Sequence, residues 1–135
     1  MPTSSVVYQG NLRTECTHIK SNSSIITDAP TDNNGKGEAF SPTDLVATAL
    51  GSCMLTIMGI SARNHDINIE GAEVSITKTM SSNPRRISKL EATMTFPDGM
   101  SYSDKEKKIL TAAANGCPVH QSIHPDIEVL VDIQY

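Results

Sequence analysis

The chain has 135 residues, a formal net charge of −4 at pH 7, no Trp and an aromatic content of only 4%. This length suits one domain over residues 1–135, because a single hydrophobic core usually organises roughly 100–200 residues. The acidic balance and the scarcity of aromatic rings argue against a nucleic-acid partner, since such proteins need a basic surface or a base-stacking platform. Leu, Ile, Val and Phe make up about a fifth of the chain, so the predicted core is aliphatic.

The sequence shows no recognisable targeting or membrane-spanning segment. Its longest apolar-rich stretch, residues 45–60, is interrupted by Thr, Gly and Ser and is shorter than the roughly 20 residues that a bilayer requires. Three cysteines, an odd number, without a secretion signal are typical of a reducing compartment. We therefore expect a cytoplasmic protein with no membrane partner.

The first 40 residues predict a β-meander followed by a loop. The turn signals are Gly10-Asn11 and the polar residues 21–24, and residues 29–39 are rich in Gly and Asn. The predicted strands cover residues 4–10, 12–20 and 25–28.

A long helix is predicted from Pro42 to about residues 63–64. Ser41 suits the N-cap, Pro42 the first helical position and Asp44 the acidic position of a capping box. Nearly every face of this helix is apolar or small, which predicts a buried helix. Gly51 in its interior predicts the close approach of another helix.

The second half of the chain predicts three more strands and two shorter helices, which makes the fold class α+β. The first of these strands is expected to kink at Gly71, and the longer helix begins with a capping box of Ser103 and Glu106. In chain order the elements are a strand over residues 67–76, a strand over 90–96, a helix over 104–114, a helical turn over 117–124 and a strand over 127–133.

The three cysteines stand in different local contexts. Cys117 is predicted at the N-terminus of a helical turn, where backbone N–H groups and the helix dipole favour a thiolate. Cys53 lies in the middle of the long helix, where a free cysteine is usually a small buried hydrophobe. Cys16 lies in a predicted strand with no activating neighbour along the chain. Local physics alone therefore favours Cys117 as the nucleophile.

A nucleophilic Cys53 would need a nearby cation. A thiol with a pKa of about 8.5 is only about 3% thiolate at pH 7, and lowering that pKa to about 6 requires about 3.4 kcal/mol. A helix terminus supplies at best about 2 kcal/mol, and Cys53 lies far from one. Among the four arginines, Arg63 lies about 15 Å further along the same helix. Arg13 is the best remaining candidate.

A zinc site is the competing hypothesis for the same residues. Cys117, His120 and His124 have a C-x2-H-x3-H spacing, and Cys53 could serve as a fourth ligand. Pro125 shortens the helix under His124, which weakens the spacing as a metal motif. Both hypotheses use the same two cysteines, so the spacing alone does not separate them.

Two blocks of the sequence resemble the OsmC/Ohr family of thiol-dependent peroxidases. The first block is FSPTDLVATALGSC, which ends at Cys53 and is similar to the family's helix that carries the peroxide-attacking cysteine. The second block is AANGCPVH, which contains Cys117 and is similar to the segment that carries the resolving cysteine. The predicted strands and the Gly-rich loop fall where that fold would have them, so the resemblance covers nearly the whole chain.

The resemblance implies a role for each of these cysteines. Cys53, as a thiolate, would attack the terminal oxygen of an organic hydroperoxide, or of an inorganic one, and become a sulfenic acid. Cys117 would condense with that sulfenic acid to form a disulfide, and an external thiol reductant, of lipoamide type in some members, would reopen it. Arg13 is an approximate match to the family's N-terminal arginine. No bound cofactor and no metal is implied.

The resemblance also implies an OsmC-like fold, with β-sheets packed around two helices and the longer helix central. Members of the family form intertwined homodimers with active sites at the subunit interface. A protein of this fold that binds a small ligand or only dimerises, without catalysis, is the alternative within the same family.

One position departs from the best-known peroxidase branch of the family. That branch has Glu directly after the helix-starting Pro, where it holds the arginine in place, and this chain has Thr43. The nearest acids are Asp44 and Glu38, and Asp44 is also suited to cap the helix. The departure indicates a divergent OsmC-like branch.

Overall fold

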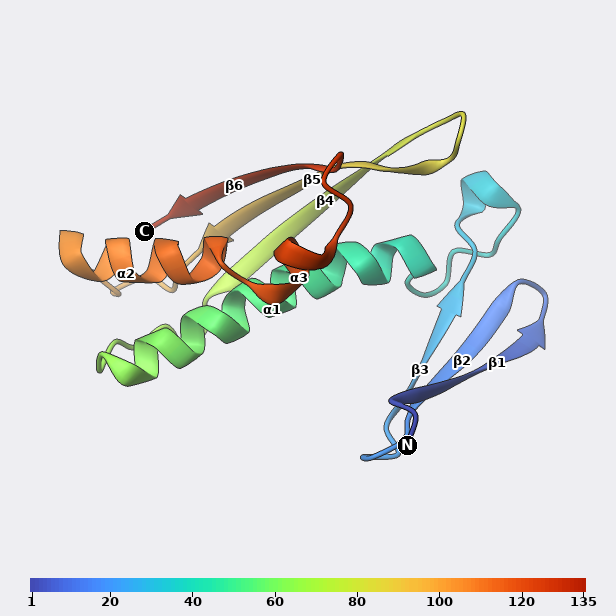
Figure 1. Cartoon of the computed structure of the whole chain (residues 1–135), viewed down its shortest axis with the longest axis horizontal. Coiled ribbons are helices and arrows are strands. Elements are labelled where there is room, and N and C mark those ends of the chain that lie inside the picture. Colours follow the sequence, from blue (N-terminus) through green and yellow to red (C-terminus); the bar gives the residue numbers. More distant parts are fainter. The chain divides into compact units, whose positions relative to one another are not determined.

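A computed structural model describes residues 1–135, and the chain divides into two compact units. The N-terminal unit is Met1–Val46 and the C-terminal unit is Ala47–Tyr135. The long helix α1, Pro42–Asn64, begins in the first unit and continues into the second (Figure 1). The expectation of a single domain stays a prediction.

The N-terminal unit contains a three-stranded antiparallel sheet with the strand order β1-β2-β3 (Figure 1). The predicted meander is therefore confirmed, although β2 is shorter at both ends than residues 12–20. The bounds are Ser4–Gly10 for β1, Arg13–His18 for β2 and Ser24–Asp28 for β3. The loop that follows contains a short 3-10 helix, Thr31–Asn33.

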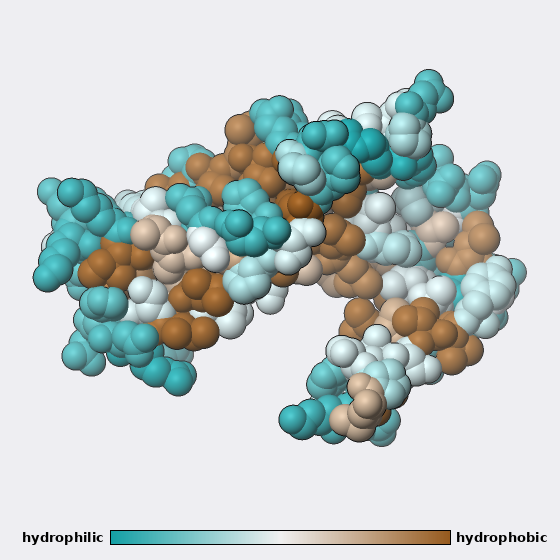
Figure 2. Space-filling view, viewed as in Figure 1, coloured by the Kyte–Doolittle hydropathy of each residue, from teal (hydrophilic) through white to brown (hydrophobic).

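The N-terminal unit has no apolar core of its own. Its buried side chains are polar ones, Thr27, Asp28 and Ser41. Apolar side chains lie instead at its surface, as Figure 2 shows. The exposed apolar residues are Met1, Val6, Val7, Tyr8, Leu12, Ile19, Ile25, Ile26, Phe40 and Val46. Several exposed apolar side chains on one small sheet favour a surface that a partner covers.

Helix α1 begins at the predicted residue with the predicted capping box. The Ser41 hydroxyl accepts a hydrogen bond from the Asp44 N–H, and the Asp44 carboxylate accepts one from the Ser41 N–H, both at 3.0 Å. The expectation of burial on every face was wrong, because Val46 and Ile60 are exposed. The buried residues form one stripe, namely Ala47, Leu50, Gly51, Met54, Met58 and Ala62.

By length and composition alone α1 is long and apolar enough to cross a membrane. The expectation that this stretch is too short was wrong, because the helix continues through Asn64 to a length of 23 residues. Its buried stripe packs into the core of the C-terminal unit, as in the core helix of a globular protein.

The C-terminal unit contains a second three-stranded sheet with the order β4-β5-β6. Strand β5 pairs antiparallel with β4 and parallel with β6. Leu90, Ala92 and Met94 alternate along β5 and are fully buried, so they form the core face of this sheet. The bounds are Glu73–Ser81 for β4, Arg86–Thr95 for β5 and Glu128–Gln134 for β6.

Two helices besides α1 belong to this unit, and Leu110 and Ala114 of the first of them join the same core. Helix α2, Asp104–Asn115, begins with the predicted capping box of Ser103 and Glu106. Helix α3, Pro118–Ser122, is a single short turn that Cys117 caps.

Two expectations about this unit were wrong. Residues 67–72 are not part of a strand, because the chain turns at Gly71, whose φ is +88°, and β4 begins only after that turn. The close neighbour of Gly51 is the sheet rather than another helix. A Cβ at Gly51 would lie 2.9 Å from Val74 and 3.0 Å from Ile76 of β4.

Candidate active site

Cys53 and Cys117 are neighbours in the C-terminal unit. Cys53 lies on α1, is partly exposed and packs against the hydrophobic core. Cys117 is part of that core and is fully buried. A side-chain hydrogen bond to Cys53 contributes to the environment of the Cys117 thiol. The structure therefore brings together the two cysteines of the sequence blocks. Cys53 is partly exposed to solvent and Cys117 is buried.

The Cys117 thiol is held in its protonated form. Burial is the largest cause that raises its pKa, and the hydrogen bond and the electrostatic interaction with Cys53 act in the same direction. The sulfur is the N-cap of α3 and accepts a hydrogen bond from the His120 N–H at 3.4 Å, which opposes the shift. The expectation of a Cys117 thiolate from local physics was wrong, because burial outweighs the end of a five-residue helix.

All three cysteines are free thiols in this structure. Cys16 lies on β2 in the N-terminal unit, in a cross-strand row between Val6 and Ile25. Its sulfur is 3.8 Å from the Thr14 hydroxyl.

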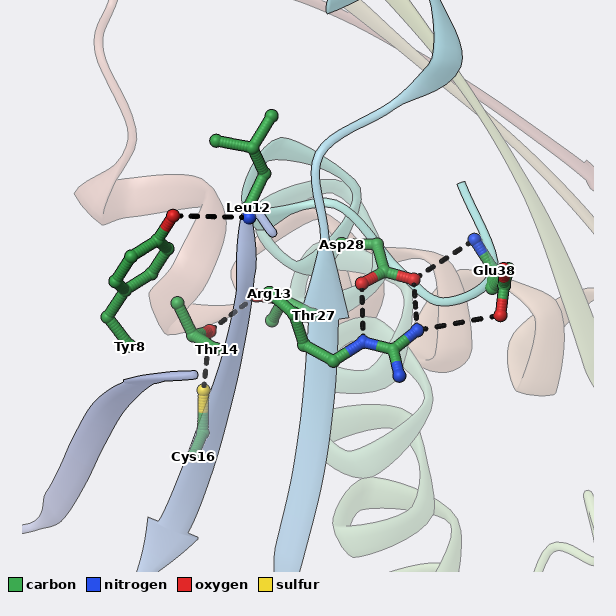
Figure 3. Close-up of polar contacts among 8 residues, drawn as sticks. All are labelled: Tyr8, Leu12, Arg13, Thr14, Cys16, Thr27, Asp28 and Glu38. Atoms are coloured by element: carbon green, nitrogen blue, oxygen red, sulfur yellow. Dashed lines mark hydrogen bonds and ion pairs between the residues drawn. The ribbon is translucent and has the colours of Figure 1, made fainter. Parts of the chain in front are cut away.

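Arg13 is held at the start of β2 by a two-pronged ion pair with Asp28 of β3 (Figure 3). Its Nε donates to Asp28 Oδ1 at 2.7 Å and its Nη2 donates to Oδ2 at 2.8 Å. Glu38 approaches the same Nη2 with a carboxylate oxygen at 3.6 Å. The paired geometry fixes the plane of the guanidinium, because both bonds must be satisfied together.

The Asp28 carboxylate is almost completely buried, with 1% of the residue exposed. Besides Arg13, it accepts a hydrogen bond from the Glu38 N–H at 3.1 Å. The hydrogen bond from Arg13 is the largest cause that holds the pKa of Asp28 below its ordinary value. The same bond raises the pKa of Arg13, so both partners are charged at neutral pH.

Asp28 is the site residue that sequence reasoning missed. Asp44 and Glu38 were the candidates for the arginine-orienting acid, but Asp44 caps α1 and Glu38 lies at the longer distance. The available signal was the hairpin register, which places Arg13 directly opposite Asp28. Arg13 lies in the N-terminal unit and the two thiols in the C-terminal unit, so its role beside Cys53 stays a prediction.

The alternative zinc site is not formed. No group of three or more His, Cys, Asp and Glu side chains is placed to hold a metal ion. Helix α3 ends before His124, whose side chain is 63% exposed and lies near Asp126. The C-x2-H-x3-H spacing therefore does not continue along one helical face, and these residues do not form a ligand set in this structure.

Comparison with protein families matches residues 35–132 to the family described as OsmC-like protein. The matched range includes both sequence blocks and extends into β6. A search of curated proteins finds no match.

Several solved structures are similar over nearly the whole chain. One is from Psychrobacter arcticus 273-4 and is provisionally called an osmotic stress induced and detoxification response protein. It is 54% identical with a TM-score of 0.94, and the alignment covers 99% of this chain and 96% of that one.

Two more distant structures show the fold alone. The organic hydroperoxide resistance protein OsmC of Legionella pneumophila is 18% identical with a TM-score of 0.73, over 100% of this chain and 98% of that one. An OsmC like protein of Mycoplasma pneumoniae is 17% identical with a TM-score of 0.78, over 97% and 94%. These likenesses confirm the predicted α+β fold of OsmC-like type.

Proposed function

The chain belongs to the OsmC-like protein family, and we propose that it is a thiol-dependent peroxidase that reduces organic hydroperoxides to alcohols. The observation that carries this proposal is the pair of neighbouring thiols, of which Cys53 is partly exposed and Cys117 is buried. The name of the Legionella pneumophila protein, an organic hydroperoxide resistance protein, points to the same substrate class.

Cys53 is the nucleophile in this proposal. Of the two thiols, Cys53 is the one that a peroxide can reach from solvent, because Cys117 is buried. The Cys53 thiolate attacks the terminal oxygen of the hydroperoxide, so that an S–O bond forms and the O–O bond breaks. The leaving alkoxide takes a proton from water and departs as the alcohol, and Cys53 is left as a sulfenic acid.

Cys117 resolves that intermediate. Because burial keeps it as a thiol, it carries the proton that the sulfenic hydroxyl needs to leave as water. The Cys117 sulfur attacks the Cys53 sulfur, one S–S bond forms and the oxidised enzyme contains a Cys53–Cys117 disulfide. An external dithiol, for which a lipoamide-type compound is the proposed example, restores both thiols by exchange and becomes a disulfide itself.

Arg13 is the proposed activator of Cys53. A thiol in the middle of a helix lacks the stabilisation of a helix end, so its thiolate needs a cation. Arg13 is permanently charged and its guanidinium plane is fixed by Asp28. Its contacts with Asp28 and Glu38 use Nε and Nη2, and Nη1 is the proposed donor to an anionic sulfur or to the leaving oxygen (Figure 3).

A homodimer is the proposed working form. The N-terminal unit buries no apolar side chain and exposes several, including Val6, Tyr8 and Ile25. A small sheet of this kind is marginal in water unless another surface covers it. Because members of the family form intertwined dimers, we propose that a second copy of the chain covers this sheet. The cytoplasm, with its reducing pool, is the proposed location because all three cysteines are free.

Turnover of a peroxide tests the proposal. Purified protein supplied with cumene hydroperoxide and an excess of dihydrolipoamide should consume the peroxide catalytically, and Cys53→Ser should abolish consumption. The matched control is Cys16→Ser, which removes a partly exposed thiol outside the pair and should leave the rate unchanged. A wild-type protein that consumes no peroxide, or a fully active Cys53→Ser variant, contradicts the proposal and favours a non-catalytic OsmC-like protein.

A further inference from the structure

We infer that Asp28 is the positioning residue for Arg13, because it holds the guanidinium with a bidentate pair. The inference rests on the proposed role of Arg13 as activator of Cys53. Asp28 touches neither the substrate nor the reacting sulfur in this scheme, and it acts by fixing the guanidinium.

The geometry distinguishes Asp28 from the two other acids near this region. Asp28 binds both Nε and Nη2 of Arg13, at 2.7 and 2.8 Å, whereas Glu38 reaches only Nη2, at 3.6 Å. The Asp44 carboxylate accepts a hydrogen bond from the Ser41 N–H at the start of α1. Only the Asp28 contact is a bidentate pair, which is the arrangement that sets the orientation of a guanidinium.

Asp28 is itself held rigidly, which a positioning residue requires. It is 1% exposed, and its backbone N–H donates to the Phe40 carbonyl at 3.0 Å. Its Oδ2 also accepts from the Glu38 N–H, which ties the Gly-rich loop to β3. The carboxylate is therefore fixed by the sheet on one side and by the loop on the other.

The bidentate pair leaves one edge of the guanidinium for chemistry. Nε and Nη2 donate hydrogen bonds to Asp28, and Nη1 lies on the side of the guanidinium that faces away from Asp28 (Figure 3). A planar guanidinium cannot turn without breaking both bonds at once. Asp28 thus decides which direction the free donors of Arg13 face.

Asp28 could instead act only by neutralising the charge of Arg13, and removing its carboxylate would then have the opposite effect on a nearby thiolate. If Asp28 only neutralised the charge of Arg13, removing its negative charge would strengthen the cation and favour a thiolate nearby. If Asp28 orients Arg13, removing the carboxylate releases the guanidinium and disfavours that thiolate. The Asp28→Asn variant, which keeps the size of the side chain, separates these roles by the direction of its effect.

The experiment measures how fast iodoacetamide, a neutral reagent, alkylates Cys53 as a function of pH. The parent protein is the full chain with Cys16→Ser and Cys117→Ser, so that Cys53 is its only thiol. Arg13→Ala should slow alkylation at neutral pH roughly tenfold or more, and Asp28→Asn roughly three- to tenfold, with the pH profile of each displaced to higher pH. Asp28→Glu, which restores a carboxylate, should recover part of the rate.

Two controls make the result specific to orientation. Glu38→Gln removes the other acid beside Arg13 and should change the rate less than Asp28→Asn does. In the Arg13→Ala background, Asp28→Asn should have no further effect, because Asp28 acts only through Arg13. Far-UV circular dichroism of each variant checks that the sheet is retained, and Asp28→Glu supplies the comparison if Asp28→Asn does not fold.

The inference is overturned if Asp28→Asn alkylates as fast as the parent, or faster, while Arg13→Ala is slow. It is equally overturned if Asp28→Asn slows alkylation by the same factor with and without Arg13, or if Arg13→Ala has no effect. Peroxide consumption is measured separately in the protein with all its cysteines. A protein that fails to consume peroxide but shows the expected alkylation profiles retains the positioning role and loses the proposed function.

Discussion

At the scale of single residues, the difference in burial between the two thiols is what assigns their roles in the proposed cycle. The position of Cys117 at the start of a helical turn favours a thiolate, but the residue is fully buried and its pKa is raised. A helix end contributes typically 0.3–1 kcal/mol, and that is too little to offset the loss of water around a buried thiolate. Cys117 therefore suits the resolving role, in which it waits as a thiol.

Cys117→Ser should limit the protein to a single turnover of peroxide. Without a resolving thiol, Cys53 should reduce about one equivalent of cumene hydroperoxide and stop as a sulfenic acid. Trapping with dimedone followed by mass spectrometry should find the adduct on Cys53. Undiminished turnover with dihydrolipoamide in this variant would show that Cys117 takes no part in the cycle.

Asp28 should link stability to pH with a definite sign. Its pair with Arg13 lowers the pKa of Asp28 from the ordinary value of 3.8, so the native state favours the carboxylate. The stabilisation is fully present above about pH 4 and is lost as the pH falls through the lowered pKa. Urea unfolding measured across this range should show a smaller acid-dependent loss in Asp28→Asn than in the wild type, and an equal loss contradicts the ion pair.

The sequence and its resemblance nominate Cys53, Cys117 and Arg13 as candidates, but they do not reveal Asp28. Acids close to the helix start drew attention because the family pattern has its acid there. Asp28 lies 15 residues from Arg13 and meets it only because β2 and β3 pair in one particular register. A shift of the register by one residue would have turned Asp28 to the other face of the sheet.

At the scale of elements, two glycines of α1 should respond in opposite ways to the same substitution. A Cβ at Gly59 meets nothing within 4 Å, so Gly59→Ala should raise the free energy of unfolding by up to about 1 kcal/mol. Gly51→Ala gains the same helix propensity but forces a Cβ against Val74 and Ile76 of β4. Overpacking typically costs about 1–3 kcal/mol, so this variant should be less stable than the wild type.

Chemical denaturation of the two variants side by side measures this difference. If Gly51→Ala proves as stable as Gly59→Ala, the close packing of α1 on β4 is contradicted. The comparison is controlled within one helix, because both positions lie in the interior of α1.

Element ends marked by side-chain caps could be predicted from the sequence, whereas contacts between elements could not. The starts of α1 and α2 follow from Ser41 and Ser103, whose hydroxyls cap the next turn. Residues 67–72 alternate like a strand, but their backbone has no ladder partner before β4 begins. Alternation of apolar and polar residues indicates which side chains are buried, but it does not indicate whether the backbone pairs with another strand.

At the scale of the whole molecule, the apolar surface of the N-terminal unit predicts a dimer. Sedimentation equilibrium should give twice the chain mass of 14.5 kDa. Ile25→Lys places a charge in the row of Val6, Cys16 and Ile25 and should favour the monomer. The control is Leu130→Lys, which alters an exposed apolar residue of the other sheet and should leave the dimer intact. A monomeric wild type would contradict the proposed working form.

The most direct test of the account is to locate the disulfide that a single turnover leaves behind. Reduced protein is treated with one equivalent of cumene hydroperoxide, excess reagent is removed, and the digested peptides are examined by mass spectrometry without reduction. The account predicts one intramolecular link, between Cys53 and Cys117, with Cys16 still a free thiol. If Cys53 and Cys117 both remain titratable after the peroxide has been added, the two thiols are not a catalytic pair.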